Sequence, residues 1–415
     1  MNGTVNSTIN QAYLDAFGRQ RFSLPKSLFD SQFQYDLNPR LWYDVPVGAG
    51  SVSTHLPYES SIGMTITTVS GRKLTRQSKE YFRYRPGKSH LLIASVLFAD
   101  AKNNLAQRVG LLDNNNGVFF QLSGTVIQVA IRSKVTGTVV DYTVNQADWV
   151  IDKLNGLGGD DNPSGIDLDL TAPQILVMDL QWLNAGRVRF GFCIGGAFVY
   201  CHEINHANVT GLTSGYMTTA NLPIRYEIEN IDTTASNSTM KQICCVIMTE
   251  CGDTPEELSY YGSTASRGVS GVTVANGTLT FMLAVRMRTS INSITNRGYT
   301  IPYLLDIHTG SSEINFQLLL NPTITAGTWS NVSTANSILE MNTTATGFSG
   351  GDVISDGLID NASTGRFSSD NLAALGRIKM YNSFDGTTGA ILCLVGQGSG
   401  GTSVCKAVLG FKEYW

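Results

Sequence analysis

Apolar and polar side chains alternate in short runs along much of this chain, and turn-forming residues separate the runs. Ile127–Ile131 and Val188–Phe192 show the alternation, with a large apolar residue at every second position. A period of two places these residues on one face of a β-strand, where they can be buried together. Gly195-Gly196 separates two such runs, which predicts a hairpin. The pattern therefore favours antiparallel sheets and predicts little helix.

Composition supports the same fold class. The chain of 415 residues is long enough for more than one core, only 15% of its residues are charged, and 42 are glycine. That balance favours strands and tight turns over salt-bridged helices. We predict an all-β fold, with an antiparallel β-sandwich of the jelly-roll or lectin-like kind over residues 61–252. A linker over residues 253–270 and a second, smaller β domain over residues 271–415 are expected to follow.

Residues 1–60 show no sustained period and contain Pro25, Pro39 and Pro46. Such a segment is predicted to be an extended N-terminal arm, which becomes ordered when its aromatic side chains dock on its own domain or on a neighbouring subunit. The residues expected to anchor the arm in an assembly are Phe17, Arg19, Arg21, Phe29 and Trp42.

Charge and apolar content exclude several partners. The net charge is -4 and no block of lysine and arginine is present, so direct contact with nucleic acid is not expected. The N-terminus lacks the features of a signal peptide, and no apolar stretch approaches 18 residues, so we expect synthesis in a cytoplasm without membrane insertion. The seven cysteines are predicted to be free, buried thiols.

The segment His202-Glu203-Ile204-Asn205-His206 matches the His-Glu-x-x-His motif of zinc metallopeptidases. That chemistry needs a helix, on which the two histidines share a face and the glutamate acts as a base on zinc-bound water. The local sequence instead predicts a strand, on which Glu203 points away from both histidines. A zinc peptidase therefore remains a remote alternative, and no metal ligand is assigned.

Other chemical signals are weak. The acidic loop over residues 148–169 lacks the spacing of a hand-type calcium loop and is interpreted as a solvated surface loop. No Gly-x-Ser-x-Gly elbow is present, and the paired carboxylates of glycosidases cannot be identified from sequence. We therefore expect no catalytic residue, no cofactor and no bound metal, and a chain that is not an enzyme.

Several segments, taken in order, resemble a family of virion structural proteins of tailed bacteriophages. They are Ala16–Arg19, Leu28–Asp30, Arg83–Lys88, Gln181–Leu183, Gly186–Phe192 and Leu222–Ile228. The resemblance implies a β-sandwich protein without a reaction in a large symmetric particle, located in the virion after synthesis in the host bacterial cytoplasm.

The expected partners are other virion proteins of the head or tail, which the chain would pack on or decorate through its arm and sandwich surfaces. A homo-oligomer, either a trimer or a hexamer, is expected because closed symmetry is usual in such assemblies. The alternative is a lectin-like, receptor-binding fibre protein that holds a host surface glycan with exposed aromatic residues and acidic loops.

Overall fold

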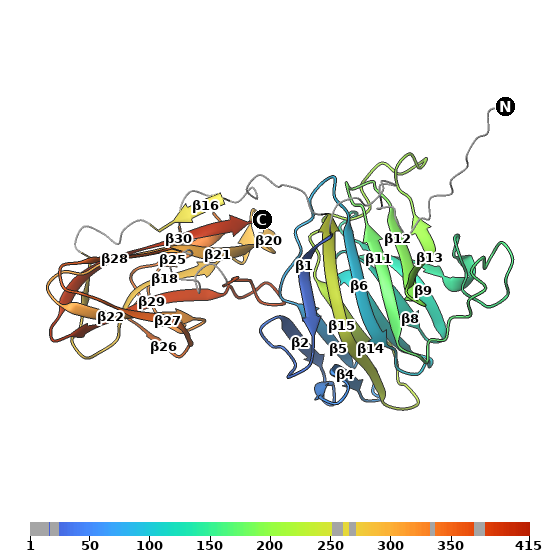
Figure 1. The fold of residues 1–415 in the computed structure, drawn as a ribbon, viewed down its shortest axis with the longest axis horizontal. Helices are drawn as coiled ribbons and strands as arrows, with labels where there is room; N and C mark the ends of the chain where they lie inside the picture. Colours follow the sequence, from blue (N-terminus) through green and yellow to red (C-terminus); the bar gives the residue numbers. More distant parts are fainter. Residues whose placement is uncertain (1–15, 17–24, 251–259, 265–270, 333–336, 369–377) are drawn as a thin grey trace. The chain divides into compact units, whose positions relative to one another are not determined.

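The computed structural model describes residues 16, 25–250, 260–264, 271–332, 337–368 and 378–415. The chain divides into two compact units, residues 1–253 and residues 254–415. The described residues contain strands in both units and one 3-10 helix, η2 (Gln146–Asp148) (Figure 1). None of them forms a helix long and apolar enough to cross a membrane. The predicted all-β class is confirmed.

In its described part, the first unit consists of two antiparallel sheets. One has the strand order β13 (Ala197–Ile204), β12 (Val188–Ile194), β11 (Gln174–Leu180), β6 (His90–Leu97), β15 (Ser238–Glu250), β4 (Ser61–Ile66) and β3 (Val52–Leu56), and β1 (Pro25–Gln32) also pairs with β15. The other has the order β10 (Val140–Asn145), β9 (Val126–Ser133), β8 (Gly117–Ser123), β7 (Leu105–Leu112), β14 (Ile224–Asn230), β5 (Lys73–Ser78) and β2 (Trp42–Val47).

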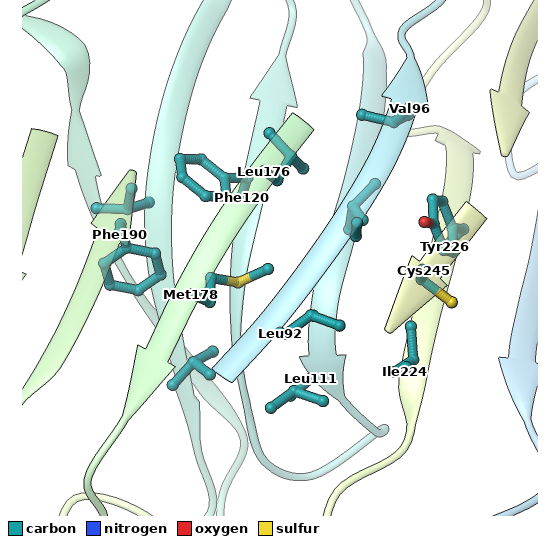
Figure 2. Close-up of a cluster of buried hydrophobic side chains, with 14 of the residues drawn as sticks. Leu92, Val96, Leu111, Phe120, Leu176, Met178, Phe190, Ile224, Tyr226 and Cys245 are labelled. Carbon is teal, nitrogen blue, oxygen red and sulfur yellow. The ribbon is translucent and has the colours of Figure 1, made fainter. Parts of the chain in front are cut away.

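The core of this unit lies between the two sheets. Phe120 on β8 and Phe190 on β12 meet edge to face, with ring centroids 5.6 Å apart. Figure 2 shows these rings together with Leu92, Met178 and Tyr226, and all five side chains are fully buried. Phe190 and Tyr226 come from strands on which apolar residues alternate, so there the period of two in the sequence corresponds to the inner face of a sheet. Leu92, Phe120 and Met178 come from strands with continuous apolar runs.

The hairpin predicted at Gly195-Gly196 is also present. The two glycines connect β12 to β13 and adopt φ values of +59° and +80°. Both values lie in the left-handed region, where glycine is favoured because it lacks a Cβ. This turn places β13 at the edge of its sheet.

The extended arm expected over residues 1–60 does not reach that far. Residues 25–56 contain three strands of the first unit: β1 pairs with β15, β2 with β5, and β3 with β4. Pro25 begins β1 and Pro46 lies on the edge strand β2, positions at which a missing N–H is tolerated. The expected boundary at residue 60 is therefore wrong, and the sandwich already includes β1.

The second unit has its own pair of sheets among the described residues. One contains β16 (Tyr260–Ser263), β30 (Ser403–Tyr414), β21 (Tyr299–His308) and β28 (Thr364–Ser368) in that order, with β17 (Val272–Val274) also paired with β30. The other has the order β24 (Trp329–Asn331), β25 (Leu339–Asn342), β18 (Thr280–Met287), β29 (Ile391–Ser399), β22 (Glu313–Leu320) and β27 (Asp352–Ile359). Two short ladders pair β19 (Ser290–Ile291) with β20 (Ile294–Thr295) and β23 (Thr323–Thr325) with β26 (Gly347–Ser349).

The expectation of a linker over residues 253–270 is wrong at residues 260–263, which form a strand. Strand β16 lies within that range and pairs with β30 along Tyr260–Ser263. The second unit has a separate core, in which Met282, Leu318 and Leu392 are fully buried. This separate core is the physical basis for treating the two units as two domains.

Six of the seven cysteines lie in the described part of the chain, and all six are free. Cys201, Cys245, Cys393 and Cys405 are buried, as predicted for small apolar residues of strands. Cys244 is exposed and therefore departs from that prediction.

Candidate functional site

A cleft of about 750 Å³ opens at one edge of the first unit. Its lining comes from β9, β10, β13 and the loop over residues 212–216. β10 and β13 are the outermost strands of their sheets, so no further described strand closes this edge. The cleft is therefore a gap between the open edges of the two sheets.

Tyr142 lines the cleft from β10. It lies opposite Ile131 in the register of β9 and β10, and residues opposite each other in an antiparallel ladder share a face. Ile131 is buried in the core, so Tyr142 projects from the same inner face at the open edge. The tyrosine is 57% exposed. It therefore presents an aromatic surface that a ligand can cover.

His202 lines the cleft from β13. It lies opposite the core residue Phe190, and its Nδ1 accepts a hydrogen bond from the backbone N–H of Val150 at 3.2 Å. Burial lowers the pKa of His202, so the ring is neutral at pH 7. With Nδ1 as the acceptor, the hydrogen-bond network assigns the ring proton to Nε2. No described protein group accepts from Nε2, which leaves one donor for a ligand.

His206 has the complementary arrangement. Its Nδ1 lies 3.0 Å from the carbonyl oxygen of Gly186, and because a carbonyl only accepts, Nδ1 must carry the proton. The ring stacks on Tyr216 with centroids 3.8 Å apart and planes 9° apart. Burial lowers the pKa of His206, so Nε2 is an unprotonated acceptor at pH 7. The two histidines thus offer the cleft one donor and one acceptor.

Glu203 points to the other side of the strand. It lies opposite Arg189 in the ladder, and its Oε2 pairs with Nη1 of Arg187 at 3.1 Å. The prediction that His202 and Glu203 lie on a strand is confirmed, because β13 runs through Ile204. No group of three or more metal-ligating side chains is found in the described residues. Glu203 is paired with Arg187 and lies on the other strand face from His202, and His206 follows the end of β13, so the three residues do not have the helical arrangement of a zinc peptidase.

The sequence motif identified His202 and His206, but it gave no signal for Tyr142. That residue lies 60 positions earlier in the chain, and it joins the histidines only because the edges of two different sheets meet. Asn205 was also missed. Its Nδ2 donates to Oε1 of Glu203 at 2.9 Å, and its side chain lines the cleft beside His206.

The predicted anchor residues do not meet at this site. Phe29 and Trp42 are buried in the core of the first unit, 8% and 2% exposed, with ring centroids 5.9 Å apart. Their assignment to an assembly contact is therefore corrected, because side chains enclosed by their own domain cannot also reach a partner. Phe17, Arg19 and Arg21 lie outside the described residues.

The acidic loop over residues 148–169 holds its carboxylates apart. Asp152 accepts hydrogen bonds from the backbone N–H groups of Leu154 and Ser164, and Asp161 pairs with Lys153 at 2.8 Å. Asp169 accepts from Thr171 within its own turn. These carboxylates stabilise the loop individually, which agrees with its interpretation as a surface loop.

A charged cluster surrounds Glu227 on β14, which is fully buried. Its carboxylate lies 2.9 Å from Nζ of Lys73, 2.7 Å from Nη1 of Arg108 and 3.3 Å from Nη1 of Arg225. Burial alone would raise the pKa of Glu227, but these three cations hold it well below its ordinary value. The partners come from three strands of one sheet, so the cluster ties that sheet together and is interpreted as structural.

Comparison with known proteins finds no matching family model and no matching curated protein. Solved structures of similar fold include a β-glucanase of Bacillus licheniformis, which is 11% identical over 54% of this chain and 98% of its own, with a TM-score of 0.35. A Bacteroides ovatus mixed-linkage glucan GH16 protein is 12% identical over 53% and 99%, with a TM-score of 0.35. A legume lectin-like domain of Entamoeba histolytica is 11% identical over 54% and 97%, with a TM-score of 0.30.

These structures correct one expectation from the sequence. We expected a chain that is not an enzyme, and the solved structures of similar fold include glycoside hydrolases. The expectation rested on missing helical and nucleophile motifs, and a missing motif does not exclude catalysis. The likeness concerns the fold, and fold alone does not assign a function.

Proposed function

We propose that the first unit binds carbohydrate in the cleft between β10 and β13. The observation that carries this proposal is a donor on His202 and an acceptor on His206, both fixed by backbone groups, in a cleft that also holds the exposed ring of Tyr142. A sugar ring combines an apolar C–H face with hydroxyl groups that both donate and accept. The cleft offers a matching surface of each kind, within the usual size of a small-ligand site.

Tyr142→Ala is expected to weaken glycan binding roughly tenfold, a loss of about 1.4 kcal/mol, because the stacking surface is removed. The wild-type chain is first screened on a glycan array, and calorimetry with the best ligand then gives the affinity of each variant. Release of reducing ends is followed in the same samples, which separates binding from hydrolysis.

The matched control is Tyr58→Ala. Tyr58 is fully exposed, and it does not line the cleft, so its removal should leave the affinity unchanged. Equal affinity of the Tyr142 variant and the wild-type chain would exclude this cleft as the glycan site.

We also propose that the chain is a component of a tailed-phage particle. Support comes from contacts between the segments that carry the resemblance. Nε of Arg187 donates to the carbonyl oxygen of Ala16 at 3.1 Å, and the hydroxyl of Tyr84 accepts from the backbone N–H of Trp182 at 3.1 Å. Segments far apart in sequence thus meet in one region, as expected if they belong to one inherited structure.

Immunogold labelling of particles produced with a tagged copy of the chain tests this proposal. The chain is expected in purified particles, and replacement of Phe17, Arg19 and Arg21 by alanine tests the anchor without changing β1 or the buried Ala16. Particles without label would contradict the virion assignment. Labelled particles with the substituted chain would contradict only the anchor.

A further inference from the structure

A second cavity of about 580 Å³ adjoins the cleft. Gln181 and Arg187 line it from the connection between β11 and β12, and Asn205 and His206 line both cavities. The two residues that follow β13 therefore form a shared wall. A ligand that leaves the cleft past His206 enters the second cavity.

The shared wall is held in place from both sides. The ring of His206 is fixed by a hydrogen bond to the carbonyl oxygen of Gly186 and by its stack on Tyr216. Gly186 and Tyr216 belong to different loops. Asn205 is fixed through Nδ2 by Glu203, which is itself paired with Arg187. Its Oδ1 receives no hydrogen bond from a described group, so it adds an acceptor beside the acceptor Nε2 of His206. The wall is therefore polar and ordered before a ligand arrives, which lowers the entropic cost of binding.

The combined size of the cleft and the second cavity favours a long ligand. Each cavity by itself falls in the range of about 300–1,000 Å³ that accommodates one small molecule. A monosaccharide would occupy only part of the cleft and would leave the second cavity empty. A chain of several sugar units places hydroxyl groups at regular intervals, which suits acceptors distributed along a wall between two cavities.

We infer that this site binds an oligosaccharide chain, which extends from Tyr142 in the cleft past Asn205 and His206 into the second cavity beside Arg187. This inference rests on the proposed carbohydrate function and specifies its ligand class. The cleft supplies the aromatic platform, the shared wall supplies hydrogen bonds at the crossing, and the second cavity supplies affinity that only a longer ligand can gain.

The test is calorimetry with a series of one to six sugar units of the best array ligand. Ala207→Trp fills the second cavity from an exposed position that does not line the cleft. The wild-type chain is expected to bind the longest ligand at least tenfold more tightly than the monosaccharide, and Ala207→Trp should abolish that gain while leaving the monosaccharide affinity unchanged. Tyr142→Ala should weaken both ligands.

Ala185→Trp, at another exposed position of the second cavity, repeats the test if the first variant does not fold, as judged by its melting temperature. Equal affinities for short and long ligands, or a full length-dependent gain in both tryptophan variants, would overturn the inference and leave the proposed carbohydrate function intact. Absence of any glycan binding by the wild-type chain would overturn both.

Discussion

Glu227→Ala is expected to lower the free energy of unfolding of the first unit by about 3–5 kcal/mol, the usual cost of removing one partner from a buried ion cluster. The carboxylate is fully buried and pairs with Lys73, Arg108 and Arg225. Without it, three cations from β5, β7 and β14 lie close together, and Glu229 still pairs with Arg108. Urea titrations of the full chain, followed by circular dichroism, measure the loss.

The same cluster predicts a dependence on pH. The pKa of Glu227 is lowered in the folded chain, so its contribution to stability is complete above the ordinary value of 4.5. As the pH falls below that value, the unfolded chain takes up a proton that the folded chain still excludes, and the contribution decreases. The wild-type chain should therefore lose stability below this pH more steeply than Glu227→Ala.

Glu59→Gln is the matched control for this substitution. Glu59 pairs with Lys241 at 2.6 Å on the surface, where its side chain is 52% exposed. Such pairs contribute less than about 1 kcal/mol because water screens them. If the Glu227 variant is no less stable than this control, the cluster does not hold the sheet together.

Strands with one buried face could be predicted from the sequence, because burial imposes a period of two. Val188–Phe192 lies in β12 and Ile127–Ile131 lies in β9, and the large apolar residues of both ranges are on the inner face. The strands of residues 25–56 could not be predicted in this way. The three prolines of this segment argue against strands in the sequence, whereas in the structure Pro25 lies at a strand start and Pro46 on a sheet edge, where proline is compatible with pairing.

The candidate site could be predicted only in part. The spacing of His202 and His206 indicated chemistry, and the local pattern predicted a strand in place of a helix. The cleft itself depends on which strands end the two sheets. Sheet order is a long-range property, so the meeting of β10 with β13, and of Tyr142 with the histidines, has no signature in the local sequence.

Trp42→Ala is expected to destabilise the first unit by about 3–5 kcal/mol, as large aromatic truncations in cores do. The ring is 2% exposed and contacts Phe29 and Tyr226 at centroid distances of 5.9 and 6.2 Å. Its Nε1 donates to Oγ of Ser31 at 2.9 Å, so truncation leaves both a cavity and an unpaired hydroxyl. Circular dichroism during urea titration measures the effect without relying on tryptophan fluorescence.

The Trp42→Ala substitution distinguishes a core role of Trp42 from a role as an assembly anchor. The two roles predict the loss of different properties, stability in one case and incorporation into particles in the other. An anchor would lose incorporation into particles at unchanged stability, whereas a core residue loses stability in the isolated chain. Tyr35→Ala removes an aromatic ring of the same segment that is 83% exposed, and its effect should stay within about 0.5 kcal/mol. Equal stability of the Trp42 and Tyr35 variants would mean that the β1 and β2 region docks on the sandwich without supporting it. The expected difference of several kcal/mol would show that this N-terminal segment is part of the fold, and that any contact with a partner must use other residues.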